Sequence, residues 1–256
     1  MKSLKEKMQS CEPIAGMHIS LNDPALSELA GGIGFDFLWI DTEHTAIDYQ
    51  TLQNHLIAAK AGGTSTLVRI PWNDNILAKR VLEMGPTGII FPMVNTAQEA
   101  EKAMRCSLYP PYGNRGFGPI RAVRYGQMNC DDYIRKESLK MCRCIQIESE
   151  QAIRNLPEIV KNPYIDAYIF GPCDLSGSVG EMNQVFNPKT TQLIDEAIEI
   201  LKDHKKTIGI STGACDKETI QYWHDKGINM ISAGTDYLYV TEMASRTCSL
   251  IREIQN

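Results

Sequence analysis

The sequence predicts an α/β protein built as a single (β/α)8 barrel, the TIM-barrel architecture. Three observations lead to this prediction. Short runs of apolar and β-branched residues recur along the chain, segments with helical apolar spacing separate them, and 256 residues is the size of one such barrel. Because strands that alternate with helices pair in parallel, the repeat favours one closed parallel barrel that takes up residues 1–256 as a single domain.

Eight runs are predicted to be strands: Ile14–Ser20, Phe37–Asp41, Thr66–Ile70, Gly88–Pro92, Arg143–Glu148, Ala167–Gly171, Thr207–Ser211 and Met230–Gly234. The helices predicted between and after them include Tyr49–Ala61, Asn75–Met84, Ala97–Ser107, Ile153–Val160, Thr191–Lys202, Glu218–Lys226 and Tyr239–Ile254. An open, doubly wound sheet is the alternative, and it typically carries a glycine-rich phosphate turn after its first strand. The chain has no G-x-G-x-x-G, so the barrel is favoured and no nucleotide cofactor is expected.

Composition favours a small-molecule partner. The formal net charge is −5, the sequence pI is near 5.6, and Lys and Arg are scattered, so neither nucleic acid nor an anionic membrane is expected as a partner. No apolar run has the length of a membrane span, and the first residues lack the apolar segment of a signal peptide, so a cytoplasmic location is expected. The eight cysteines form no CxxC pair and are expected to be free thiols.

Two segments raise the question of contacts between subunits. The longest stretch without a predicted strand runs from Tyr109 to Lys136, and its length suggests a functional loop over the barrel mouth or a subunit contact. The last predicted helix has an apolar face, which either packs against the barrel or is exchanged with a neighbouring subunit. This face contains Val240, Met243, Ala244, Ile251 and Ile254.

The second predicted strand ends in titratable side chains. Its apolar run continues into Asp41, Glu43 and His44 within four residues. In a parallel barrel the carboxyl ends of the strands carry the active site. We therefore predict that Asp41 and His44 act together as acid and base, the alternatives being a helix cap for Asp41 and a hydrogen-bonded loop residue for His44.

Alternation of side chains along the third strand directs Arg69 into the barrel while Val68 and Ile70 face the helices. An inward arginine at a strand end suits a clamp on a substrate carboxylate or a developing enolate. The structural alternative is an ion pair with Glu43 or Glu148.

The same alternation directs Gln146 and Glu148 inward at the end of the fifth strand. Asp174 follows 26 residues after Glu148, about one βα unit along the chain. Since adjacent strands lie about 5 Å apart, the two carboxylates are predicted to share one hard divalent cation such as Mg²⁺, Mn²⁺ or Co²⁺. The structural alternatives are a salt bridge for Glu148 and a helix N-cap for Asp174.

The lysines argue against a Schiff-base enzyme, which needs a lysine that projects from a strand into the pocket. None of the predicted strand ends carries one, because Lys60, Lys79, Lys102 and Lys161 fall on helical or loop segments. Carbonyl activation is therefore expected to come from a metal ion.

Six short motifs in order along the chain resemble the HpcH/HpaI aldolase family, and within it the bacterial 2-oxo-3-deoxy acid aldolases. They are Ile40-Asp41-x-Glu43-His44, Val68-Arg69-x-x-Trp72-Asn73-Asp74, Pro92-Met93-Val94, Tyr109-Pro110-Pro111-x-Gly113-x-Arg115-Gly116, Gln146-x-Glu148 and Gly171-Pro172-x-Asp174-Leu175-Ser176. Each motif alone is weak, and the ordered set is specific.

This resemblance implies a metal-dependent, class II aldolase that cleaves a 4-hydroxy-2-oxo acid to pyruvate and an aldehyde, and that runs the reverse addition. By the resemblance, Glu148 and Asp174 are the metal ligands and Gln146 is oriented toward substrate or metal-bound water. Arg69 holds pyruvate and its enolate oxygen.

The resemblance also implies that the backbone N–H groups around Cys173 and Asp174 take the pyruvate carboxylate, and that His44 moves protons through water with Asp41 nearby. Glu83 matches a family acid that supports this histidine. Cys173 stands where the family commonly has alanine. A hexamer with helix exchange between subunits is a further implication.

Two other functions remain open from the sequence. One is a lyase for malyl-, citramalyl- or citryl-CoA esters, for which Arg115, Arg121 and Arg124 are the candidates to bind phosphate near the mouth. The other is a barrel that binds a 2-oxo acid without catalysis. The inward polar set, Asp41, His44, Arg69, Gln146, Glu148 and Asp174, argues against the second, because such groups are costly to keep in a core without use.

Overall fold

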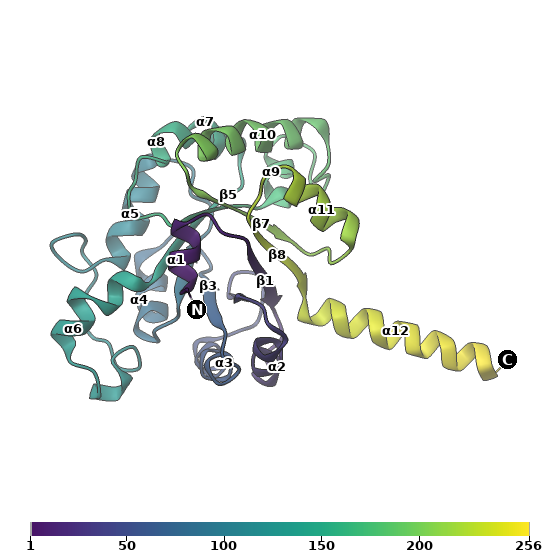
Figure 1. Ribbon diagram of the computed structural model, residues 1–256, viewed down its shortest axis with the longest axis horizontal. Coiled ribbons are helices and arrows are strands. Elements are labelled where there is room, and N and C mark those ends of the chain that lie inside the picture. Colours follow the sequence, from purple (N-terminus) through teal and green to yellow (C-terminus); the bar gives the residue numbers. More distant parts are fainter. Residues whose placement is uncertain (1, 256) are drawn as a thin grey trace.

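The computed structural model describes residues 2–255 and forms a closed barrel of eight parallel strands, each hydrogen-bonded to the next and the last to the first. Figure 1 shows helices ranged around this barrel. The strands are β1 (Ile14–Ile19), β2 (Phe37–Asp41), β3 (Ser65–Arg69), β4 (Gly88–Phe91), β5 (Cys142–Ile147), β6 (Ala167–Phe170), β7 (Thr207–Thr212) and β8 (Met230–Thr235). The predicted (β/α)8 barrel and all eight predicted strands are confirmed, with bounds that differ by at most one residue at either end.

The helices alternate with these strands. They are α1 (Leu4–Gln9), α2 (Ala25–Ile33), α3 (Tyr49–Ala61), α4 (Asn75–Glu83), α5 (Ala97–Ser107), α6 (Cys130–Arg135), α7 (Glu150–Arg154), α8 (Leu156–Ile159), α9 (Pro172–Ser178), α10 (Pro188–Asp203), α11 (Lys217–Asp225) and α12 (Asp236–Gln255). Two short 3₁₀ helices, η1 (Arg124–Gly126) and η2 (Glu137–Lys140), lie in the long insertion before β5.

One predicted helix was wrong as a single element. The segment Ile153–Val160 is divided between α7 and α8 at Asn155, which has φ −92° and ψ −3°. Pro157 in the first turn of α8 has no N–H to donate back to the preceding turn, so the apolar spacing continues while the hydrogen-bond ladder does not. The Asn155 side chain instead donates from Nδ2 to the Asn95 carbonyl at 2.8 Å.

Side-chain caps stabilise the first turns of several helices. Asp48, Asp74 and Asp216 cap α3, α4 and α11 by accepting hydrogen bonds from backbone N–H groups of the first turn. Thr96 and Glu99 form a reciprocal capping box at α5. These caps fix the points at which the chain leaves the barrel mouth, because each of these helices follows a strand.

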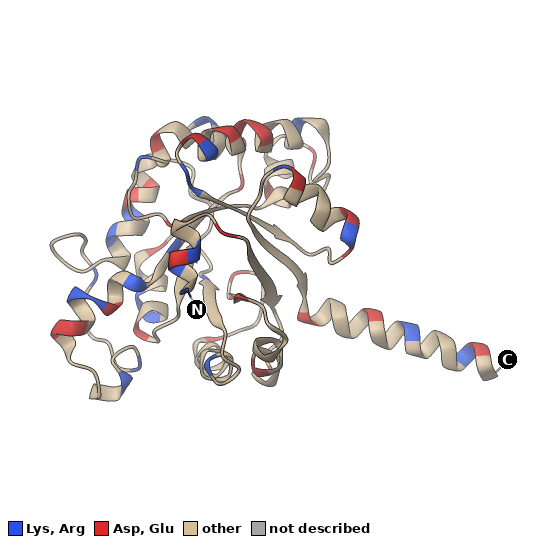
Figure 2. Ribbon diagram, viewed as in Figure 1, with Lys and Arg blue, Asp and Glu red and all other residues tan. Residues whose placement is uncertain are grey.

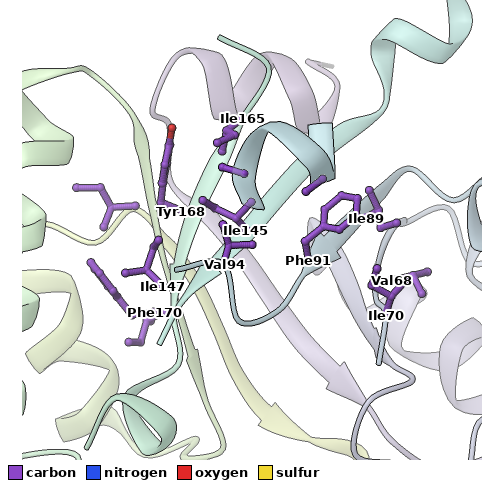
Figure 3. Close-up of a cluster of buried hydrophobic side chains, with 14 of the residues drawn as sticks. Val68, Ile70, Ile89, Phe91, Val94, Ile145, Ile147, Ile165, Tyr168 and Phe170 are labelled. Atoms are coloured by element: carbon purple, nitrogen blue, oxygen red, sulfur yellow. The ribbon is translucent and has the colours of Figure 1, made fainter. Parts of the chain in front are cut away.

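The core has two layers. Between strands and helices lies a large apolar cluster that includes Val68, Ile70, Ile145, Ile147 and Phe170, shown in part in Figure 3. A smaller cluster fills the barrel itself, and Leu4 and Met8 of α1 close the end at which the strands begin. The opposite end, where the strands finish, carries the polar residues described below.

The insertion from Tyr109 to Lys136 does not cover the barrel mouth. Its backbone bonds to the last turn of α4, with Ala122 N–H donating to the Glu83 carbonyl at 3.2 Å. In a (β/α)8 barrel the helices run antiparallel to the strands, so the end of α4 lies at the face where strands begin. The expectation of a loop over the mouth was wrong, and the alternative of a subunit contact stays open.

Helix α12 leaves the barrel. Figure 1 shows it projecting away as a single extended helix, so of the two alternatives for its apolar face, packing against its own barrel was wrong. Of its residues only Asp236, at the start, is buried. Within residues 2–255 no helix is both long and apolar enough to cross a membrane.

Candidate active site

Arg69 is the cation at the centre of the barrel mouth. It pairs in register with Asp41 of the neighbouring strand, and its Nε and Nη2 donate to the two Asp41 carboxylate oxygens at 2.9 and 2.6 Å. Its Nη1 lies 2.9 Å from Glu43 Oε2. The guanidinium is also placed over the Trp39 ring, 5.4 Å from its centroid. Arg69 therefore points inward as predicted, and it is held by three side chains from one neighbouring segment.

This ion pair shifts the protonation of both acids. Burial by itself would raise the pKa of Asp41, but the hydrogen bonds and charge of Arg69 outweigh it and hold that pKa below its usual value. Burial raises the pKa of Glu43, and the charge of Arg69 offsets this only in part. Asp41 is thus the more firmly ionised partner of Arg69.

Glu148 and Gln146 form a second buried group on the β5 side. Gln146 Nε2 donates to Glu148 Oε2 at 2.7 Å, and the Met93 backbone N–H donates to Glu148 Oε1 at 2.6 Å. Gly171 approaches so closely that a Cβ there would lie 2.5 Å from Glu148 Oε2. Both side chains point inward as the alternation predicted, and Glu148 is 3% exposed.

Glu148 is short of positive charge. Burial raises the pKa of Glu148 to about 7, and the nearby charges of Asp174 and Glu43 act in the same direction. Asp174 lies in the first turn of α9 and is exposed, and the N-cap of that helix is Gly171, without a side-chain cap. The expected alternative of an N-cap role for Asp174 was therefore wrong.

These groups fit a hard divalent cation. Glu148 and Asp174 repel one another electrostatically, and the carbonyl oxygen Gln146 Oε1 is buried without a hydrogen-bond partner. A cation beside them would offset the repulsion between the carboxylates, and it or its bound water would give Gln146 Oε1 a partner. Within residues 2–255 no group of three or more His, Cys, Asp or Glu side chains is placed to hold a metal. The site therefore suits an ion bound by two carboxylates, with water and substrate oxygens supplying the remaining ligands.

His44 lies at the rim of the mouth. Its side chain is 65% exposed, and its Nε2 lies 3.8 Å from Glu43 Oε2. Asp41, the acid expected to pair with it, directs both carboxylate oxygens to Arg69 instead. The nearest acid to His44 is therefore Glu43, which the sequence had suggested only as a partner for Arg69.

Cys173 and Glu83 occupy different surroundings. Cys173 is exposed in the first turn of α9, with its Sγ 3.6 Å from Asn183 Oδ1. Glu83 is at the last position of α4, where its Oε1 lies 3.4 Å from the Arg115 guanidinium. Within the described chain Glu83 makes no contact with His44, because the two lie at opposite ends of the barrel.

The arginines considered for a CoA phosphate are also remote from the mouth. The Arg115 side chain is 1% exposed, and it donates to the Leu82 carbonyl and to the Tyr133 hydroxyl. Arg121 donates to the Met84 carbonyl and, with Arg124, lines a cavity beside Thr64 and Thr87 at the beginnings of the strands. The expectation that these residues form a basic surface near the mouth was wrong for the single chain.

Sequence reasoning missed two residues of the barrel interior. His18 of β1 packs against Trp39 in a tilted arrangement, with ring centroids 4.9 Å apart, and its Nε2 lies 3.4 Å from Ser211 Oγ of β7. A signal was present, since Ile14, Gly16 and His18 share one side of the strand and a histidine at an inward position is unusual. The contact with Ser211 could not be predicted from the sequence, because it joins residues far apart in the chain.

Fold and site together define a (β/α)8 enzyme whose acidic mouth suits a divalent cation and an anionic substrate. The chain belongs to the HpcH/HpaI aldolase/citrate lyase family, whose model matches residues 15–242. It is accordingly a carbon–carbon lyase, and the family is one of divalent-metal-dependent enzymes.

Three similar proteins illustrate this membership. A 4-hydroxy-2-oxo-heptane-1,7-dioate aldolase of Shigella sonnei is 33% identical over 91% of this chain and 88% of its own length. A hydroxypyruvate/pyruvate aldolase of Roseobacter denitrificans is 31% identical over 92% of this chain and 91% of its own. The crystal structure of an HpcH/HpaI aldolase from Desulfitobacterium hafniense is 25% identical and superposes with a TM-score of 0.89, covering 99% of this chain and 98% of that one.

Proposed function

We propose that this protein is a class II pyruvate aldolase, which cleaves a 4-hydroxy-2-oxo acid to pyruvate and an aldehyde and catalyses the reverse addition. The observation that carries the proposal is that buried Glu148 lies near enough to Asp174 and Arg69 for their charges to interact at one end of the barrel. The family membership and the two aldolase relatives support the same reaction.

Glu148 and Asp174 would hold the divalent cation, Mg²⁺, Mn²⁺ or Co²⁺. When bound, such an ion polarises the keto group of a 2-oxo acid and stabilises negative charge on its enolate. Gln146 keeps Glu148 in place through the hydrogen bond from Nε2, and its free Oε1 can accept a bond from metal-bound water or from substrate. No Schiff-base lysine is part of this proposal.

Arg69 would bind the 2-oxo acid and its enolate oxygen. Its guanidinium is fixed by Asp41 and Glu43, so it stabilises developing charge without having to reorient. The backbone N–H groups of Cys173 and Asp174 would bind the substrate carboxylate. They start helix α9, and within the described chain neither donates a hydrogen bond.

His44 would move the proton. It is exposed at the rim, so water can connect it to a reacting carbon, and an imidazole can both accept and donate a proton. Asp41 contributes by orienting Arg69 and by adding negative charge near His44. Glu83 has no part in this scheme within one chain.

The test is proton exchange at the pyruvate methyl group, followed by proton NMR in deuterated water. Chelator-treated protein should give the protein-free rate, and addition of Mn²⁺, Mg²⁺ or Co²⁺ should give exchange that the His44→Ala and Arg69→Ala variants lose. No exchange by folded, metal-loaded protein would contradict the proposal, and cleavage of CoA thioesters would then be tested next. Binding of pyruvate and metal without exchange would indicate the non-catalytic barrel.

We further propose that α12 docks on a second copy of the chain, in an oligomer that the family resemblance suggests is a hexamer. The projecting helix exposes Val240, Met243, Ile251 and Ile254, and a cavity of about 850 Å³ runs along it beside Cys248. Exposed apolar faces of this kind mark protein contacts. A cytoplasmic location, expected from the sequence, stays a prediction.

A further inference from the structure

The floor of the barrel mouth is polar but uncharged on one side. His18 pairs in register with Trp39, which places it one inward layer below Asp41. Phe170 pairs with Ile210, so Ser211 lies at the level of Gly171, the residue that touches Glu148. His18 therefore borders the floor of the site and Ser211 its wall, on the side of the barrel formed by β7, β8 and β1.

This uncharged side has unused hydrogen-bonding capacity. The 3.4 Å contact between His18 Nε2 and Ser211 Oγ is long for a hydrogen bond. The hydroxyl of Ser232, on the strand between them, is buried and has no partner. Burial, and then the charge of Arg69, lower the pKa of His18 to about 4, against smaller opposite effects of Asp41 and the Ser232 backbone. The ring is thus neutral at neutral pH. Because a hydrogen bond with the Ser232 backbone engages one of its nitrogens, the other nitrogen is the one available to a ligand.

We propose that His18 and Ser211 bind a hydroxyl group on C3 of the 2-oxo acid, so that the enzyme takes a 3-hydroxy-2-oxo acid in preference to pyruvate itself. This inference rests on the proposed aldolase function. The carboxylate and keto oxygens are assigned to the α9 start, Arg69 and the acids, so the C3 end is the part of a deep-bound 2-oxo acid that can face the floor. A methyl group there would leave the polar pair unsatisfied, whereas a hydroxyl both donates and accepts.

A site built to bond a substrate hydroxyl discriminates against the analogue that lacks it, here by roughly tenfold to a hundredfold. Hydroxypyruvate and pyruvate are the matched probes. In both, the base removes a proton from C3, the electron pair of that bond moves toward the C2 oxygen, and solvent returns a deuteron to C3 in deuterated water. Exchange at C3 therefore reports enolisation of either acid without any aldehyde.

The experiment compares exchange into the two acids by metal-loaded wild-type protein and three variants. We expect faster exchange into hydroxypyruvate, and we expect Ser211→Ala and His18→Leu to slow it roughly tenfold or more while exchange into pyruvate is kept. His18→Gln, which keeps a donor and an acceptor, should restore part of the preference.

Ser27→Ala is the matched control. Ser27 Oγ also bonds a buried histidine, at 2.8 Å from His55 Nδ1, but this pair lies between α2 and α3, outside the barrel. The control should leave the preference unchanged. Equal exchange into both acids, or a preference that survives Ser211→Ala and His18→Leu in folded protein, would overturn the inference and leave the aldolase proposal intact.

Calorimetric binding separates the two proposals if neither acid exchanges. The aldolase function would then fail, while tighter binding of hydroxypyruvate than pyruvate, lost in Ser211→Ala, would still support the assigned hydroxyl site. Equal binding of the two acids would overturn it.

Discussion

Arg69 shows how the barrel mouth holds a buried cation. Its guanidinium bonds to Asp41 and Glu43, and it is the cation among the acids at this end of the barrel. Burial disfavours its charged form, and Asp41 more than compensates, so the pKa of Arg69 is raised and the residue stays ionised. A fixed cation of this kind can stabilise an enolate oxygen without reorganisation.

We predict that Arg69→Ala abolishes exchange into pyruvate, by about a hundredfold or more, and leaves divalent metal binding in place. The reason is that Arg69 binds the acids Asp41 and Glu43 and makes no ion pair with the proposed metal ligands Glu148 and Asp174. Exchange and Mn²⁺ titration on the same preparation measure the two effects. Arg80→Ala is the control, since Arg80 stacks on Tyr49 on the helical side of the barrel. Loss of metal binding or of folding in Arg69→Ala would show that its role is structural.

His18 gives a prediction about stability and pH. Its pKa is about 4 in the folded protein and 6.5 in the unfolded chain, so the unfolded chain takes up the proton first as pH falls. Stability should therefore fall between pH 6.5 and 4, by up to about tenfold in the unfolding equilibrium per pH unit from this group. Urea unfolding at several pH values should show a shallower slope for His18→Gln, and an identical slope in both proteins would refute the assignment.

At the scale of elements, the turn from β6 into α9 brings together the two proposed metal ligands. Gly171 ends β6 and lies against Glu148, while Asp174 follows in the first turn of α9. The turn has no room for a side chain at its first position, which is why glycine is required there although its φ of −103° is ordinary.

Gly171→Ala should weaken divalent metal binding by about tenfold or more, because the new Cβ would displace Glu148. Gly213→Ala, at the first residue after β7, is the control, since a Cβ there meets nothing within 4 Å. Mn²⁺ titration of both variants tests the prediction. Equal affinity in the two would mean that Glu148 is free to move or does not bind the metal.

At the scale of the molecule, the barrel and helix α12 present different kinds of surface. Figure 2 shows Lys and Arg interspersed with Asp and Glu around the barrel, without a single large basic region. Helix α12, in contrast, combines charged residues with an exposed apolar row. Met243 is 59% exposed and Ile251 50% exposed, which the described chain alone does not cover.

Met243→Asp combined with Ile251→Asp should convert an oligomer to monomers, because two charges would be buried in the contact. Light scattering coupled to size exclusion measures the mass in solution. Ser249→Asp is the control, since Ser249 is on the same helix but does not line the cavity along α12. An unchanged oligomer in the double variant would place the subunit contact elsewhere, for example at the insertion before β5.

The sequence by itself determined the barrel and the direction of its inward side chains. Both are local properties: apolar spacing identifies each strand and helix, and the period of two places Arg69, Gln146 and Glu148 on the inner side. The helical period misled at Asn155, since the apolar spacing continues where Pro157 interrupts the hydrogen bonds.

Only the tertiary structure decided which side chains meet. In the structure Asp41 bonds to Arg69 and not to His44, and Arg121 lies at the opposite face of the barrel. His18 contacts Ser211. Helix α12 projects away from its own barrel. The physical reason is that these contacts depend on the closure of the sheet and on the course of long connections, whereas periodicity in the sequence reports only the side of an element on which each residue lies.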